Sequence, residues 1–226
     1  MTWLIDNFDR VVELTKTHLY LSLLPILIGL LIAVPVGTAI RNVPWIRKIT
    51  LTAASIAFTI PSLALFVTIP AVLGTKILDD INVVIALAVY STALLVRAVP
   101  EALDSVPDAV VDSARAMGFT SLRLALTVEL PLALPVLVAN VRVVAVTNIS
   151  LVSVGSVIGI GGLGELFTQG YQRDYPDQII AGIISIVFLA LVFDAALYLI
   201  GRWLTPWTRA GKHRAGKPRS PRKAAA

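Results

Sequence analysis

The sequence predicts an all-α membrane protein with about five transmembrane helices. Of its 226 residues, 57% are hydrophobic and 15% are charged, whereas soluble domains carry about 25% charged residues. Five stretches with few or no charges are long enough, or nearly so, to cross the hydrocarbon core as helices. A long charged interval separates the third stretch from the fourth, and lipid would not tolerate it. That interval therefore lies in water or against a partner.

Composition also argues against several kinds of site. The chain has no cysteine, so it has no disulfide, thiol nucleophile or cysteine-based metal site. Its two histidines, His18 and His213, are too few for a histidine-built metal site. The net charge is +5, and the distribution of its basic residues follows membrane topology. The charge therefore does not indicate nucleic-acid binding. We therefore expect a non-catalytic chain that binds no cofactor or metal itself.

The first expected element is an amphipathic helix over residues 1–17 that lies on the membrane surface. Apolar and charged residues alternate there at helical spacing, which is typical of interfacial helices. Its acidic residues argue against a secretory signal peptide, which begins with basic residues.

The spans then follow in order, and prolines interrupt the first two. They are expected at residues 19–40, 49–75 and 81–96, within 130–164, and, after a polar loop at 165–177, at 178–201. The first contains Pro25 and Pro35, and the second contains Pro61 and Pro70. Membrane helices tolerate such prolines only where neighbouring groups satisfy the freed carbonyls.

The distribution of Lys and Arg predicts the orientation. With the C-terminus inside, fourteen of the nineteen basic residues face the cytoplasm and four face outward. Because basic residues are enriched in cytoplasmic loops, we expect the N-terminus outside and the C-terminus inside. Residues 206–226 form a basic, Pro-containing tail that we expect to be disordered and to lie against anionic lipid.

The charged interval is predicted to be a cytoplasmic helix-turn-helix. Ser105 can cap a first helix, and Gly118 suits the left-handed position that ends it. A second helix can begin at residues 120–121 and run to Glu129, before a break at Pro131. The apolar face of the first helix is expected to contain Val106, Ala109, Val110, Ser113, Ala114 and Met117. A helix pair of this kind could also simply lie on the bilayer surface.

The spacing inside this interval resembles the EAA loop of ABC-importer permeases. That motif reads Glu-Ala-Ala, three residues, Gly, nine residues, then Ile-x-Leu-Pro, and here Asp and Ser replace Glu and Ala while Val128 replaces Ile. In that family the loop is the coupling helix that docks in a groove of a cytoplasmic ATPase. The resemblance implies the ATPase-coupling residues Asp112, Ser113, Ala114, Arg115, Met117, Gly118, Leu130 and Pro131.

Three further runs, at residues 60–65, 128–135 and 158–165, resemble permeases of importers for glycine betaine, carnitine, choline or proline betaine. The likeness covers about residues 18–205, with the coupling loop at about 98–131. It implies a five-helix permease in a prokaryotic plasma membrane. It also implies a second permease, identical or homologous, ATPase subunits that bind ATP and Mg, and an extracytoplasmic substrate-binding protein. The Gly-Gly-Leu-Gly run also resembles methionine-importer permeases, so an amino-acid importer stays open.

Two nucleotide-binding patterns are rejected on context. Residues 159–164 satisfy G-x-G-x-x-G, but the dinucleotide fingerprint needs a preceding strand, and a membrane helix precedes this run. Residues 211–217 approximate a P-loop, but Pro218 occupies the Ser/Thr position that would bind magnesium. Energy from ATP must then come from a partner.

Two ionisable residues inside the spans, Arg142 and Asp194, are functional candidates because charges at membrane depth need partners. Counted from the cytoplasmic edge, they lie at depths of roughly 16 and 12 Å. We expect them to form an ion pair, which could equally be a purely structural salt bridge.

The translocation path is expected between the second, third and fourth spans, where Phe58, Pro61, Ser62 and Tyr90 are candidates. These aromatics do not amount to an evident cage for a quaternary ammonium ion. Substrate selectivity is therefore expected to lie in the binding protein. A stand-alone secondary transporter and a membrane-embedded enzyme are the remaining alternatives. The transporter would usually show internal repeats, and we find no convincing repeat in this sequence. The enzyme would need a catalytic set, and neither His18 nor His213 lies within a span near a plausible nucleophile.

Overall fold

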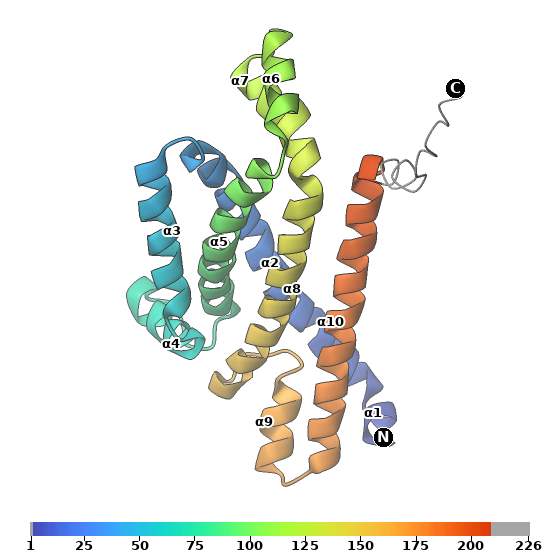
Figure 1. Ribbon diagram of the computed structural model, residues 1–226. Helices are drawn as coiled ribbons and strands as arrows, with labels where there is room; N and C mark the ends of the chain where they lie inside the picture. The colour runs from blue at the N-terminus through green and yellow to red at the C-terminus, as the bar shows by residue number, and fades with distance from the viewer. Residues whose placement is uncertain (1, 209–226) are drawn as a thin grey trace, which may run out of the picture.

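The computed structural model describes residues 2–208, and within that range the chain forms helices and no strand (Figure 1). The predicted all-α membrane fold is confirmed. The elements in chain order are α1 (Thr2–Asp6), α2 (Phe8–Ile40), α3 (Pro44–Thr59), α4 (Ser62–Leu73), α5 (Asp80–Asp104), α6 (Asp108–Ala116), α7 (Ser121–Leu124), a π-helical turn (Ala125–Glu129), α8 (Leu130–Gly155), a 3-10 turn (Ser156–Ile158), α9 (Glu165–Gln172) and α10 (Pro176–Leu204). The basic tail beyond residue 208 lies outside the described residues.

Four helices in the described range are long and apolar enough to cross a membrane, and a bent helix pair can supply a fifth span. The bent pair is α3 and α4, whose axes differ by 98°. The bend falls at Ile60 and Pro61, both of which have extended backbone conformations. Proline disfavours a helical conformation in the residue before it and has no N–H to continue the ladder. Pro70, by contrast, is accommodated inside α4 without ending it.

Three expected boundaries differ from the structure. The third span was expected at residues 81–96, but α5 continues to Asp104. Residues 8–17 continue into the first span as one helix, so only the five residues of α1 stand apart from it. Their expected place at the membrane surface stays a prediction. The polar stretch 165–177 is not a simple loop, because α9 occupies most of it. The turn after α9 holds Asp174 in a left-handed conformation and leads directly into α10.

The core forms where α2, α5 and α8 pack together. Ala33, Leu95 and Ala145 come from these three helices, and none of them is exposed. Glycines let α2 approach α5 closely: a Cβ on Gly29 would lie 2.7 Å from the Cβ of Ser91, and one on Gly37 would lie 2.7 Å from that of Val99. Such small-residue contacts are the usual means of tight helix packing in membranes.

The last helix, α10, is attached to this core mainly through α8 and α9. Five of its 29 residues are buried, so most of its surface faces outward within the described chain. Figure 1 shows α6 and α7 at the same end of the molecule as the end of α10, with α1, α4 and α9 at the other end. The two ends of the described chain thus lie at opposite ends of the molecule.

We predict that Gly29→Ala destabilises the α2–α5 contact, because the added methyl group would clash with the Ser91 backbone and side chain. Overpacking of this kind costs about 1–3 kcal/mol. The midpoint of thermal unfolding in detergent should fall. Ala39→Val, at an exposed position of the same helix, is the matched control and should leave it unchanged.

The orientation can be checked because the chain has no cysteine of its own. We predict that an impermeant maleimide labels Gln172→Cys in intact cells, because the distribution of Lys and Arg places the α9 end outside in the expected orientation. Ser121→Cys, at the α7 end, should be labelled only after the membrane is permeabilised. The opposite labelling pattern would reverse the orientation.

Candidate functional site

The interval expected to be a coupling loop projects from one end of the molecule as α6, a turn and α7 (Figure 1). The helix α6 begins at Asp108, after Pro107, with an acid in its first turn, where the helix dipole favours negative charge. The predicted cap at Ser105 is wrong: its hydroxyl donates to the carbonyl of Ala102 at 2.6 Å. Ser105 therefore closes α5 instead of opening α6, because α5 extends to Asp104.

The turn between the two helices depends on Gly118. Its φ is +83°, and a Cβ placed on it would meet nothing within 4 Å. Glycine is therefore favoured here because of its backbone conformation, and not because a side chain would lack space. The N–H of Gly118 donates to the carbonyl of Arg115 at 2.9 Å, and that of Phe119 donates to the carbonyl of Ala114 at 3.3 Å. These bonds satisfy carbonyls at the C-terminus of α6.

The expected apolar face of α6 is only partly right. Val111 and Ala114 are the buried residues of the helix, whereas Val110, which was expected on that face, is exposed. The buried pair packs with Val106 and Leu124 from the two ends of the loop. Val111 and Ala114 are three residues apart, so they share the face of α6, which contacts α7 and the π-helical turn.

The tip of the loop presents apolar side chains to the surroundings. Met117 and Leu122 are each 71% exposed. Beside them, Asp112 and Arg115 form an exposed ion pair with 3.7 Å between nitrogen and oxygen. Ser113 bonds its own helix, through its hydroxyl to the carbonyl of Ala109. A surface that mixes large apolar groups with charges suits docking to another protein.

The predicted break at Pro131 is also wrong, because the helix runs on from α7 through a π-helical turn into α8. The N–H of Leu130 bonds the carbonyl of Ala125, one residue farther back than in an α-helix. Pro131 has no N–H, so it cannot bond the carbonyl of Thr127 as an α-helix would require. The wide turn accommodates this missing donor, and the helix continues without a break.

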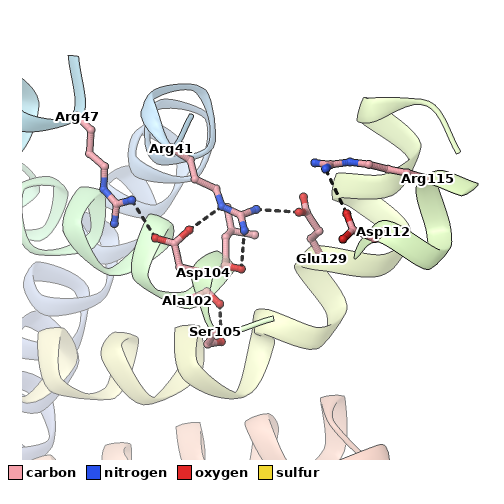
Figure 2. Close-up of polar contacts among 9 residues, drawn as sticks. Arg41, Arg47, Ala102, Asp104, Ser105, Asp112, Arg115 and Glu129 are labelled. Carbon is pink, nitrogen blue, oxygen red and sulfur yellow. Dashed lines mark hydrogen bonds and ion pairs between the residues drawn. The ribbon is translucent and has the colours of Figure 1, made fainter. Parts of the chain in front are cut away.

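Four charged side chains meet at the base of the loop, and we call them the Arg41 cluster: Arg41, Arg47, Asp104 and Glu129 (Figure 2). Nε of Arg41 donates to Oδ1 of Asp104 at 2.8 Å, Nη1 donates to Oε1 of Glu129 at 2.8 Å, and Nη2 donates to the carbonyl of Leu103 at 3.0 Å. Nη1 of Arg47 lies 2.9 Å from Oδ2 of Asp104.

The inner part of the Arg41 cluster is shielded from water. The side chains of Arg41 and Glu129 are 15% and 10% exposed, so their bonds are screened less than those of a surface pair. Burial alone would lower the pKa of Arg41, but the carboxylates of Asp104 and Glu129 outweigh it and raise that pKa above its ordinary value. The guanidinium is therefore a fixed positive charge between two carboxylates.

Sequence reasoning did not identify this cluster. Arg41 and Arg47 were counted only as cytoplasmic basic residues, and Glu129 only as the end of a helix. One signal was available, because a lone glutamate at the boundary of an apolar run needs a partner. The partner comes from 88 residues away in the sequence, however, so no local pattern identifies it.

The structure brings Arg142 and Asp194 together between α8 and α10. Nε and Nη2 of the arginine donate to the two carboxylate oxygens at 2.8 and 2.6 Å, and the Tyr198 ring lies 5.2 Å from the guanidinium carbon. About a third of each charged side chain remains exposed. Both border an open groove of ≈ 630 Å³ whose other walls are mainly apolar.

The candidate path residues gather at the elbow between α3 and α4. The rings of Phe58 and Tyr90 meet edge to face, with centroids 5.5 Å apart. The Tyr90 hydroxyl donates to the carbonyl of Ile60, next to the break at Pro61. Ser62 is the first residue of α4. Phe58, Pro61 and Ser62 thus lie at the bend between α3 and α4, and Tyr90 contacts this bend from α5.

The glycine run at residues 159–164 follows a 3-10 turn and closes over His18. The N–H of Leu163 donates to Nδ1 of the buried His18 at 3.2 Å, so Nε2 carries the proton and donates to the carbonyl of Ile149 at 2.9 Å. Gly162 has a φ of +106° and lies against the imidazole. Gly162 serves this packing. The P-loop-like run at 211–218 lies outside the described residues.

Taken together, the long apolar helices and the helix-turn-helix at one end form a bundle of the kind found in polytopic membrane proteins. A family model described as "Binding-protein-dependent transport system inner membrane component" matches residues 26–210. The chain belongs to this family, and it is a multi-pass protein of the plasma membrane.

Curated relatives and solved structures agree with that membership. The Osmoprotectant import permease protein OsmW of Salmonella typhimurium is 36% identical, over 90% of this chain and 96% of its own. The Glycine betaine/carnitine/choline transport system permease protein OpuCB of Bacillus subtilis is 30% identical, over 91% and 94%. A structure of the MetNI methionine ABC transporter, in inward-facing conformations, matches with a TM-score of 0.78 at 24% identity, over 91% and 99% of the two chains.

We predict that exchanging the charges of Arg142 and Asp194 together preserves the fold better than reversing the charge of either residue alone. Arg142→Asp or Asp194→Arg alone would place two like charges together in the membrane. The double exchange should yield more monodisperse protein in detergent than either single variant. Equal yields from the double and single variants would mean that the pair does not stabilise the α8–α10 contact.

Proposed function

We propose that this chain is the transmembrane permease subunit of an ATP-driven importer for osmoprotectants such as glycine betaine, carnitine or choline. The observation that carries the proposal is the helix-turn-helix expected to be the coupling loop, in a chain that belongs to this permease family. The curated relatives of the chain are named for these solutes. Those relatives match about nine-tenths of the chain, so the likeness includes the membrane helices as well as the loop.

The coupling loop is the proposed contact with the ATPase. Asp112, Ser113, Ala114 and Arg115 lie on α6, and Met117 and Gly118 form the exposed turn that follows. Leu130 and Pro131 begin α8, so they link the loop to a span. ATP and Mg bind to the partner, and ATP acts by stabilising one of two conformations more than the other. This chain supplies the pore and performs no catalysis.

The path is proposed to pass the elbow of α3 and α4, where Phe58, Pro61, Ser62 and Tyr90 lie. Discontinuous membrane helices are common at transport sites. Irregular backbone at membrane depth is tolerated only where it lines a cavity or is buried in protein. An extracytoplasmic binding protein would deliver the solute and select it. The exposed face of α10 suits a second permease or lipid.

A second permease in the pore is supported by the relatives. Two Bacillus subtilis proteins, OpuCB and OpuCD, carry the same system name, and they are 30% and 29% identical to this chain. Two permease chains thus belong to one named system. The second subunit here is an identical copy or a homologue of that kind.

A methionine importer is the second candidate. Structures of a methionine ABC transporter share the fold at 24–26% identity. The curated relatives named for osmoprotectants are closer, at up to 36% identity. We therefore place osmoprotectants first, and the assay below includes methionine.

Uptake of labelled glycine betaine into vesicles tests the proposal. The vesicles carry this chain with its ATPase, partner permease and binding protein, and we predict uptake that requires ATP. Gly118→Val should abolish that uptake while the subunits still assemble, because a branched residue at φ +83° is strained by about 1–2 kcal/mol. Gly74→Val is the matched control: its φ is +70°, its Cβ would also meet open space, and it lies at the other end of the molecule.

The solutes separate the candidates. Uptake of methionine without betaine would keep the importer and replace the substrate. Uptake that does not depend on the ATPase would support a secondary transporter instead.

A further inference from the structure

We propose that Arg47 and Asp104 transmit movement of the coupling loop to the α3–α4 elbow, while Arg41 holds the two ends of the loop together as one unit. This inference rests on the proposed function, because it takes the loop to be the ATPase contact. It goes further by naming the side chains that connect the loop to the candidate path. None of them belongs to the loop tip that would touch the ATPase.

Arg41 joins both ends of the loop. Its three nitrogen atoms bond three separate acceptors: the carbonyl of Leu103 and the carboxylate of Asp104, where the chain leaves α5, and the carboxylate of Glu129, where it approaches α8. A guanidinium is planar and rigid, so the positions of its acceptors are fixed relative to one another. Residues 105–128, which lie between these anchors, can then shift only with both anchors together.

Asp104 carries the connection onward to α3. One of its oxygens accepts from Arg41, and the other lies 2.9 Å from Nη1 of Arg47, in the first turn of α3 (Figure 2). None of the sixteen residues of α3 is buried. Ile46, Leu51 and Ala54 pack against the core only as partly buried residues, so a charged bond at the end of α3 contributes to setting its tilt.

The other end of α3 is tied to the same helix, α5. There the Tyr90 hydroxyl bonds the carbonyl of Ile60 at the elbow. Asp104 and Tyr90 are fourteen residues apart on α5, and Arg47 and Ile60 are thirteen residues apart along the α3 segment, so both spacings are roughly 20 Å. Two polar contacts thus join α3 to α5, one at the base of the loop and one at the candidate path. A displacement of Asp104 tilts α3 and changes the elbow.

The burial of the four side chains fits a division of roles. Arg41 and Glu129 are 15% and 10% exposed, whereas Arg47 and Asp104 are 30% and 39% exposed. Charged bonds that water reaches are weaker and exchange more readily than shielded ones. The shielded bonds keep the ends of the loop together, and the more exposed bond makes the adjustable connection to α3.

The test uses the complete transporter in vesicles, with solute uptake and ATP hydrolysis measured on the same preparation. Arg47→Gln and Asp104→Asn should retain ATP hydrolysis while uptake per ATP falls by roughly tenfold, within the usual range of coupling between sites. Arg47→Lys keeps the charge and should restore most of the uptake per ATP. Arg97→Gln is the matched control, because it breaks an exposed ion pair with Glu101 on α5 that does not involve α3 or the loop.

A reversible cross-link separates coupling from folding. Because the natural chain has no cysteine, Arg47→Cys with Asp104→Cys places two thiols at the connection, and the partner subunits are used without reactive cysteines. We expect poor uptake per ATP before the reaction, recovery after treatment with a short bis-methanethiosulfonate, and loss again after reduction. The complex is already assembled throughout, so the change reports the connection alone.

The proposal is overturned if Arg47→Gln and Asp104→Asn keep uptake per ATP within about twofold of the parent, which is below the usual range of coupling between sites. It is also overturned if the cross-link leaves uptake per ATP unchanged. Failure of the proposed function is distinguishable, because then the unmodified transporter itself would lack ATP-dependent uptake. If the unmodified transporter shows normal uptake and the variants do not change it, the proposed transmission through Arg47 and Asp104 is wrong, whereas the proposed importer function stands.

Discussion

The close approach of α2 to α5 is the constraint on which the rest of the structure depends. Gly29 and Gly37 bring the two backbones together, and the same line of contact ends at Ile40, directly before Arg41. A wider separation would move Arg41 away from the end of α5 and from Glu129. Small residues inside the membrane thus determine where a charged cluster forms at its edge.

Several backbone irregularities interrupt the regular helices of the described chain, and three of them share a setting. The α3–α4 elbow, the turn at Gly118 and the π-helical turn before α8 all lie at the candidate path or the coupling loop. Proline explains two of them, because Pro61 and Pro131 each remove one N–H from a helix. The surrounding helices are otherwise regular and packed, so displacement is directed to these points.

Much of this fold can be predicted from the sequence, because the lipid bilayer directly limits which segments can cross it, by their charge and hydropathy. The spans, the charged interval and the left-handed turn at Gly118 all follow from local rules. The pairing of Arg142 with Asp194 could also be anticipated, from depth along two helices. The Arg41 cluster and the role of His18 could not, because their partners are distant in sequence. The predicted break at Pro131 failed because a proline can be absorbed by a wide turn as well as by a chain break.

The π-helical turn before α8 also restricts how the length of this chain can change. It contains one residue more than an α-helical path would need, and it places Glu129 against Arg41. Loss of a single residue between 125 and 129 would restore an ordinary helix and rotate everything before it by about 100° relative to α8. The spacing from Asp112 through Gly118 to Pro131 matches the family motif, so the tip of the loop shares that restriction. Related chains that carry the motif should therefore keep a constant length from the tip of the loop to its base.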